Sequence, residues 1–330
     1  MTSSKKNKIA EYVKFLRNTS PYINSHRGKT FLLALSGEAM WHENFSNIIL
    51  DIALLQSMGI KLVLVHGIKY QPNNQNKFLG IHKSSDIQTS VTDRFSMSLI
   101  KDAVGSTKIN IEAMFSSGVA SSPMHNSKIK VVSGNFIIAK PAGIKEGIDL
   151  QYTGEIRRID ALNIHKQLEE NAIVLLSPIG YSPSGEVFSL DYRDLAVQAA
   201  INLKAEKLIM FTQNEGIQDE NGKLLRTLSI SEAQKYLNNT GSYCEQKQAL
   251  KSCFEACKNN ISRSHIVSYT VNGALLQELF TRDGNGTLIL KNSIGLIRQA
   301  AIDDIGDLLK LIEPQEKTDI PYFFQVLKRI

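Results

Sequence analysis

The sequence predicts an α/β protein built around a buried, mainly parallel sheet. Two segments, Thr30–Leu35 and Ile60–Val65, are runs of almost unbroken aliphatic residues, which is typical of strands buried on both faces. The segment between them carries apolar residues at helical spacing from Phe45 to Leu55 and ends at Gly59. Strand, helix and strand in this order indicate a parallel βαβ unit.

The elements on either side of this unit follow from the same patterns. Ile9–Leu16 has one apolar face at helical spacing and precedes the first strand. Val91–Phe115 is expected to be mainly helical. Lys128–Lys140 is rich in β-forming residues, and we expect it to form a hairpin that turns at residues 133–135.

The second half of the chain continues the alternation of buried strands and helices. Further elements are expected, in chain order, at Ile173–Ser177, Tyr192–Leu203, Lys207–Thr212, His265–Tyr269, Ala274–Phe280 and Thr287–Leu290. The turn-rich stretch Asp219–Lys223 is expected to be a hairpin tip. A new strand and helix begin at Gly295, but the 36 residues from there are fewer than the ~40 that a domain normally needs to fold alone.

The composition is that of an ordinary globular protein. The 330 residues suffice for one large domain or two modest ones, and 42% of them are hydrophobic and 21% charged. The net charge of +6 is too small to indicate nucleic-acid binding. No apolar run approaches the ~20 residues of a membrane span, and no signal peptide is recognisable. Three cysteines cannot form a disulfide framework, so we expect a cytoplasmic protein. From the charge and the lack of a membrane span, we expect neither a nucleic-acid nor a membrane partner.

Two short patterns that could bind phosphate or metal are incomplete. The sequence Gly28-Lys29-Thr30 resembles the end of a phosphate-binding loop, but the glycine required five positions earlier is Ile23. Cys253 and Cys257 lie one helical turn apart without a second pair at ligand spacing, which favours a partly buried helix face. We therefore predict no metal site.

Five segments, taken together and in order, resemble the amino-acid-kinase-type domain of bacterial N-acetylglutamate synthases, the amino-acid N-acetyltransferases of arginine biosynthesis. They are residues 21–31, 131–139, 154–160, 203–207 and 273–287. The resemblance extends over about residues 10–315. It implies a three-layer αβα amino-acid-kinase-like fold with a mainly parallel central sheet, followed by an acetyltransferase (GNAT-like) domain.

The resemblance also implies how the chain is organised. Residues 1–27 would be an N-terminal helix and linker that joins subunits into a homo-oligomer, and residues 28–293 an L-arginine-binding domain. Residues 294–330 would be the start of the acetyltransferase domain, which transfers acetyl from acetyl-CoA to L-glutamate in the full-length family. No Gln/Arg-x-x-Gly-x-Gly/Ala loop for acetyl-CoA follows Gly295. We therefore expect no cofactor and no catalytic residues in this chain, which would be a natural truncation or a fragment.

Several positions that the resemblance aligns with the active site of acetylglutamate kinases are altered or degenerate. They are Ala34, Gly37, Gly67, Ser90 and Arg193. Ala34 replaces a lysine and Arg193 an aspartate, whereas phosphoryl transfer depends on cations positioned around the phosphates. Ser90 replaces the arginine that would hold the substrate carboxylate, and a bulky isoleucine follows Gly67 where glycine would let the backbone approach. Phosphotransfer is therefore not expected.

A second set of positions matches the arginine-binding residues of the family: Tyr22, His265, Glu278, Phe280, Gly284 and Gly286. A guanidinium ligand needs a carboxylate, which Glu278 could supply from an otherwise apolar helix. Without the resemblance, Glu278 reads as a solvated helix residue and His265 as a structural histidine. We expect the Glu278 carboxylate to lie in an exposed cleft, so that Glu278→Ala abolishes arginine binding but leaves folding intact. Asn285 replaces the family's usual aliphatic residue.

Three functions from different classes therefore compete. The first is a regulatory, arginine-binding domain of an N-acetylglutamate synthase without phosphotransfer or acetyltransfer of its own. The second is an acetylglutamate kinase, which would phosphorylate N-acetylglutamate with ATP. The third is a non-catalytic structural remnant that binds neither ligand.

Overall fold

The structure is a computed structural model that describes residues 3–68, 91–117, 129–219, 221–239, 244–281 and 283–291. The chain divides into two units, Met1–Asn292 and Ser293–Ile330, and every described residue belongs to the first. The expected start of an acetyltransferase domain at residues 294–330 therefore lies outside the described residues.

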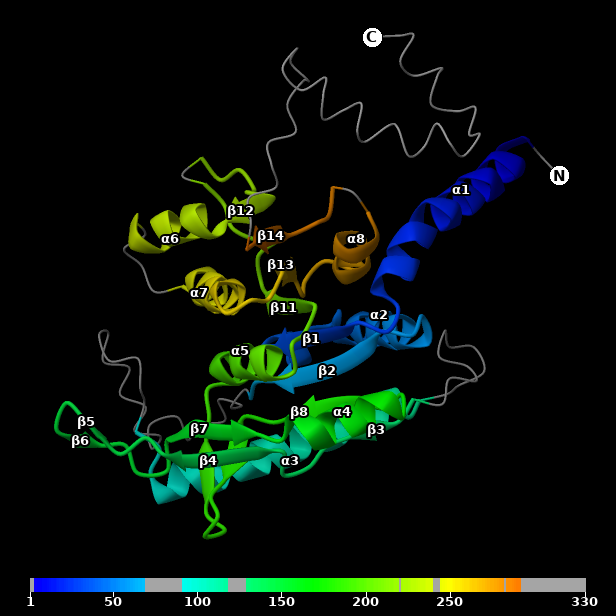
Figure 1. Cartoon of the computed structure of the whole chain (residues 1–330). Coiled ribbons are helices and arrows are strands. Elements are labelled where there is room, and N and C mark those ends of the chain that lie inside the picture. The colour runs from blue at the N-terminus through cyan, green and yellow to red at the C-terminus, as the bar shows by residue number, and fades with distance from the viewer. Residues whose placement is uncertain are drawn as a thin grey trace, which may run out of the picture. The chain divides into compact units, whose positions relative to one another are not determined.

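An eight-stranded sheet forms the centre of the described unit (Figure 1). Its strands, from one edge to the other, are β12 (Thr227–Ser229), β14 (Thr287–Leu290), β13 (Arg263–Ser268), β11 (Lys207–Thr212), β1 (Thr30–Leu35), β2 (Lys61–His66), β8 (Ile173–Leu176) and β3 (Val131–Val132). Neighbouring strands run parallel except for β13 and β14, which are antiparallel. The predicted mainly parallel sheet is confirmed.

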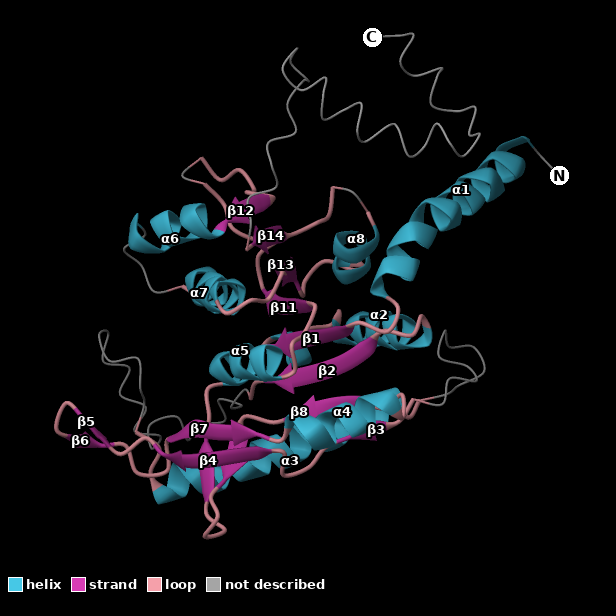
Figure 2. Cartoon of the chain, viewed as in Figure 1, coloured by secondary structure: helices cyan, strands magenta, loops and turns pink. Residues whose placement is uncertain are grey.

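Alternation along each strand builds a hydrophobic core on both faces of this sheet. In β1, Leu32 and Ala34 face one core, and Phe31, Leu33 and Leu35 face the other. Helices α4 (Ala161–Glu169), α5 (Tyr192–Asn202), α6 (Ile230–Asn239) and α7 (Glu245–Lys258) contribute to the first core. The second core takes residues from α2 (Phe45–Ser57), α3 (Arg94–Phe115) and α8 (Ala274–Phe280). The three-layer αβα fold is thus confirmed (Figure 2).

The N-terminal helix is longer than the sequence suggests. Helix α1 runs from Ser3 to His26 and contains Pro21, so the expected linker is part of the helix. Gly28, which has a φ of +74°, follows the helix, and its N–H donates to the Gly59 carbonyl at 2.8 Å. A positive φ favours glycine, which explains why the chain can turn sharply into β1 at this point.

The expected hairpin over residues 128–140 is wrong. The chain there forms β3, which pairs with β8 of the central sheet, and β4 (Ile137–Pro141), which joins a second sheet. This sheet has the order β10 (Val187–Ser189), β9 (Ile179–Tyr181), β4 and β7 (Gly154–Ile159). Residues 133–135 therefore carry the chain from one sheet to the other. Local β-forming tendency identifies strands but does not determine their partners.

Three short elements connect the longer strands and helices. Strands β5 (Ile144–Lys145) and β6 (Ile148–Asp149) pair antiparallel around Glu146 and Gly147, both at positive φ, as a tight two-residue hairpin requires. The predicted turn near Asp219 is present, because the Gly222 N–H donates to the Asp219 carbonyl at 3.0 Å. Glu220 lies outside the described residues. An η1 turn (Ala39–Trp41) follows β1.

The remaining expectations for this unit concern cysteines and membranes. Cys253 and Cys257 are both buried in α7, where they belong to the first core. Over the ranges given above, no group of three potential ligating side chains could hold a metal ion. In those same ranges, no helix is long and apolar enough to cross a bilayer.

A buried histidine at the end of β2 predicts a pH-dependent stability. His66 is fully buried. Its Nδ1 lies 2.8 Å from the Gly67 carbonyl, and its Nε2 lies 2.8 Å from the Ser177 hydroxyl. Burial lowers the pKa of His66 to about 4. Since the unfolded chain binds the proton near pH 6.5, acidification favours unfolding. We expect the free energy of unfolding, measured by urea titration, to fall by roughly 3 kcal/mol on account of this group between pH 7 and pH 4.

Replacing the histidine itself checks this prediction. His66→Asn should remove part of the pH dependence, because asparagine does not titrate. A urea midpoint of the His66→Asn protein that varies with pH as the wild type does would contradict the prediction.

Candidate functional site

The side chain of Glu278 on α8 is the centre of a buried polar cluster. Its Oε1 lies 2.7 Å from Nδ1 of His265, and its Oε2 accepts hydrogen bonds from the backbone N–H groups of Asn285 and Gly286, both at 2.8 Å. The side chains of Glu278 and His265 are only 5% and 4% exposed. The carboxylate is thus held from one side by a strand and from the other by a loop.

The expectation that Glu278 lies in an exposed cleft is wrong, and so is the alternative of a solvated helix residue. The loop after α8 folds back over the carboxylate and supplies two of its hydrogen bonds. Glycines make this possible. At Gly284, whose φ is +62°, a Cβ would overlap the Glu278 carboxylate, and at Gly286 it would overlap the Ile266 carbonyl. The residues that the sequence singled out are therefore close together.

The electrostatics of the cluster favour a charged Glu278. Burial alone would raise the pKa of Glu278, but the hydrogen bonds from His265, Gly286 and Asn285 outweigh it, and the pKa is lowered. Burial lowers the pKa of His265 although the Glu278 contact opposes this. The arrangement fits a neutral imidazole that donates from Nδ1 to the carboxylate.

Lys207 on β11 completes the cluster, and sequence reasoning missed it. This lysine is 3% exposed, and its Nζ lies 3.4 Å from Nε2 of His265 and 5.7 Å from the centroid of the Phe31 ring. Burial, together with Arg263, lowers the pKa of Lys207 to about 8. The pairing of β11 with β13 aligns Ile209 with His265 and so puts Lys207 on the same face. A lysine opening an apolar strand was the available signal.

The two aromatic candidates lie where α1 meets α8. Phe280 is buried, and its ring centroid is 5.8 Å from that of His26. Nε2 of His26 lies 3.1 Å from the Leu279 carbonyl, so α1 is attached to the turn of α8 that follows Glu278. Tyr22 is half-buried against the same core. His26 is a further contact that the sequence did not reveal.

A cavity of 650 Å³ opens at the carboxyl ends of β1 and β2. Gly37, Gly67 and Arg193, three of the degenerate kinase positions, line it. The two glycines pack so closely that a Cβ at Gly67 would lie 2.8 Å from the Gly37 nitrogen. Ala34 is fully buried in the core and does not reach the cavity, and Ser90 lies outside the described residues.

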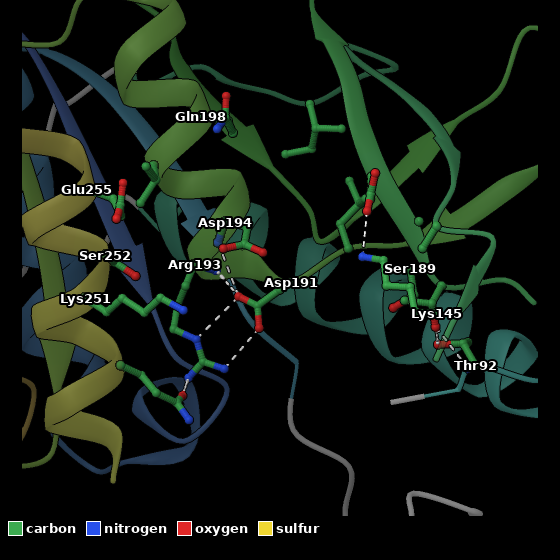
Figure 3. A pocket seen from close by; sticks show the side chains of 18 of the residues that line it. Thr92, Lys145, Ser189, Asp191, Arg193, Asp194, Gln198, Lys251, Ser252 and Glu255 are labelled. Atoms are coloured by element: carbon green, nitrogen blue, oxygen red, sulfur yellow. Dashed lines mark hydrogen bonds and ion pairs between the residues drawn. The ribbon is translucent and has the colours of Figure 1, made fainter. Parts of the chain in front are cut away.

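Arg193 lies in the first turn of α5, where neighbouring side chains hold its guanidinium, so it is not available to contact a phosphate (Figure 3). Its Nη2 lies 3.0 Å from Oδ2 of Asp191, and its guanidinium also donates to Gln248 and lies over the Tyr192 ring. Asp191 is the N-cap of the same helix and accepts the Arg193 backbone N–H at 2.7 Å. Asp191 and Arg193 line both this cavity and a second, neighbouring one.

The second cavity, of 720 Å³, is the one drawn in Figure 3. Side chains of both charge signs line it, and Lys145 pairs with Glu155 at 2.7 Å. Burial raises the pKa of Asp194, which lines the cavity beside Arg193. Because both positive and negative side chains line this cavity, its charge does not favour binding of an anion.

Comparison with known proteins places these features in context. Residues 29–268 match the amino acid kinase family. An amino-acid acetyltransferase of Pseudomonas fluorescens (strain SBW25) is 47% identical over 312 residues, which are 94% of this chain and 72% of that protein. The crystal structure of N-acetylglutamate synthase from Neisseria gonorrhoeae, complexed with coenzyme A and L-arginine, has a TM-score of 0.77 and 34% identity over 92% of this chain and 71% of its own. Carbamate kinase from Giardia lamblia, 16% identical with a TM-score of 0.57, shares the fold over 80% of this chain and 99% of its own.

Proposed function

The chain belongs to the amino acid kinase family and to the family of the amino-acid acetyltransferases, and we propose that its kinase-like domain binds L-arginine as a regulatory ligand. The N-acetylglutamate synthase from Neisseria gonorrhoeae is a relative whose structure contains L-arginine. The observation that carries the proposal is the Glu278 carboxylate, buried beside His265 and Lys207. We propose Tyr22, His265, Glu278, Phe280, Gly284 and Gly286 as the binding residues.

The chemistry of the cluster suits both ends of an amino acid with a guanidinium. Each carboxylate oxygen of Glu278 can accept more than one hydrogen bond, so its present partners do not use all of its lone pairs, and guanidinium donors could take the others. The α-carboxylate of the ligand needs a cation, which Lys207 supplies from the neighbouring strand. A buried charge pair of this kind is strong because few water molecules screen it.

The proposal includes the absence of phosphotransfer by this domain. The alanine at position 34 brings no charge, and Arg193 is engaged by Asp191 and Gln248. The carboxylates of Glu38 and Glu245 line the cavity where phosphates would lie and would repel them. Incubation with ATP and N-acetylglutamate in hydroxylamine should yield no hydroxamate, and hydroxamate formation would favour an acetylglutamate kinase instead.

We further propose residues 28–293 as the arginine-binding domain, residues 1–27 as the segment that joins subunits, and residues 294–330 as part of the acetyltransferase domain. On α1, Val13 and Leu16 are 39% and 64% exposed and lie three residues apart on a helix, which suits contact with a second copy. Light scattering on the purified chain should give a mass above that of one chain, and a monomer would contradict this part.

The arginine proposal predicts a saturable heat of binding. Titration of the purified chain with L-arginine by calorimetry should give a saturable heat, because each chain has a Glu278 cluster. Agmatine lacks the α-carboxylate that Lys207 would hold and should bind to this cluster more weakly, by about tenfold or more. The absence of heat up to millimolar L-arginine would overturn the proposal and leave a structural role.

A further inference from the structure

The 650 Å³ cavity at the ends of β1 and β2 carries more negative than positive charge. Among the described residues that line it, Glu38, Asp191 and Glu245 are acidic, and Arg193 is the one cation. Arg193 pairs with Asp191 and also attracts Glu245, but neither Glu38 nor Glu245 forms an ion pair among the described residues. Among the described residues, Oε2 of Glu245 accepts one hydrogen bond, from the backbone N–H of Gln213 at 3.0 Å.

A tyrosine hydroxyl in the same cavity also lacks a hydrogen-bond partner among the described residues. Tyr269 follows β13, is only 5% exposed and lines the cavity, yet its hydroxyl makes no hydrogen bond within the described ranges. No enclosed side-chain oxygen or nitrogen in those ranges is unsatisfied, so this hydroxyl reaches the cavity surface. Burial and the carboxylates of Glu245 and Glu38 raise the pKa of Tyr269 to about 12. The negative charges of both carboxylates therefore disfavour ionisation of the Tyr269 hydroxyl.

From this geometry we infer that the cavity binds a small organic cation bearing an amine or guanidinium group. Its ammonium or guanidinium N–H groups would donate to Glu38 and Glu245, and the Tyr269 hydroxyl would donate to or accept from a second polar group. The inference goes beyond the arginine proposal, because it concerns a different set of residues from the Glu278 cluster.

Size and donor chemistry exclude two other occupants. A cavity of 650 Å³ is in the ordinary range for small-molecule sites, roughly 300–1,000 Å³, and is far larger than a bare ion. The described residues also hold no cluster of three ligating side chains for a metal. A phosphate compound would face two carboxylates and a guanidinium already occupied by Asp191.

The test uses putrescine, a four-carbon diamine, as the probe, with calorimetry on the whole chain. We expect saturable binding to the wild type and to Glu278→Gln, since the latter alters only the proposed arginine site. Glu245→Gln and Glu38→Gln should each weaken binding by about tenfold or more, because each removes one charge-assisted contact. Tyr269→Phe should weaken it by a smaller factor.

Matched controls separate this site from nonspecific attraction. Glu255→Gln alters a carboxylate that lines only the neighbouring 720 Å³ cavity and should leave the putrescine Kd unchanged. Glu38 is exposed, so Glu38→Gln should fold normally, which circular dichroism would verify. No saturable heat with putrescine, equal affinity in wild type and both glutamine variants, or loss of binding only in Glu278→Gln would each overturn the inference.

Discussion

Glu278→Gln is expected to bind L-arginine at least about 30-fold more weakly than the wild-type chain. The substitution keeps the shape of the side chain but removes the charge that would pair with the guanidinium. Truncating one partner of a buried, hydrogen-bonded charge pair costs roughly 2–5 kcal/mol, and each 1.4 kcal/mol is a factor of ten in Kd. Calorimetric titration of both proteins with L-arginine measures the difference.

The variant with alanine separates binding from folding. Glu278→Ala would leave the N–H groups of Asn285 and Gly286 and the His265 ring without their acceptor. We expect a loss of about 2–4 kcal/mol in the free energy of unfolding, since each buried unsatisfied group costs roughly 1–3 kcal/mol. This reverses the sequence-based expectation that folding would be intact.

An exposed glutamate provides the control for both variants. Glu186→Gln changes a carboxylate on the exposed turn between β9 and β10 and should alter neither arginine binding nor stability. If Glu278→Gln bound L-arginine as tightly as Glu186→Gln, the cluster would be structural and the arginine proposal would fail.

Gly286→Ala is expected to destabilise the chain by roughly 3 kcal/mol or more, or to prevent folding. A Cβ at this position would overlap the carbonyl oxygen of Ile266 on β13, and the neighbour is backbone that cannot rotate away. To relieve the overlap, the loop must move and the hydrogen bond from the Gly286 N–H to Glu278 must lengthen. Urea unfolding followed by circular dichroism measures the loss.

A second glycine-to-alanine change serves as a control, because it adds a Cβ at a position where there is space for it. Gly105 lies inside α3, and a Cβ there would meet nothing within 4 Å. Gly105→Ala should raise the free energy of unfolding by about 0.5–1 kcal/mol, because alanine favours a helix interior. Equal stability of the two variants would mean that the loop does not pack on β13 as described.

The fold was largely predictable because the buried strands carry their own signal. Runs such as Thr30–Leu35 and Lys207–Thr212 are apolar on both faces, and this pattern distinguishes a parallel central strand without knowledge of its neighbours. The hairpin over residues 128–140 was predicted incorrectly because its two halves pair with β8 and β7, which are distant in sequence. Strand partners depend on long-range contacts that local composition does not encode.

The candidate site was predictable in its residues but not in its environment. The sequence by itself predicted that Glu278 lies in a helix that is followed by glycines. The resemblance to the N-acetylglutamate synthases then identified the six proposed arginine-binding residues. Only the tertiary structure decided that the carboxylate is buried, that Lys207 joins the cluster, that His26 connects α1 to α8, and that Arg193 is paired with Asp191. The physical reason is that burial, and with it the pKa and pairing of each charge, arises from groups that the fold brings together from separate strands and loops.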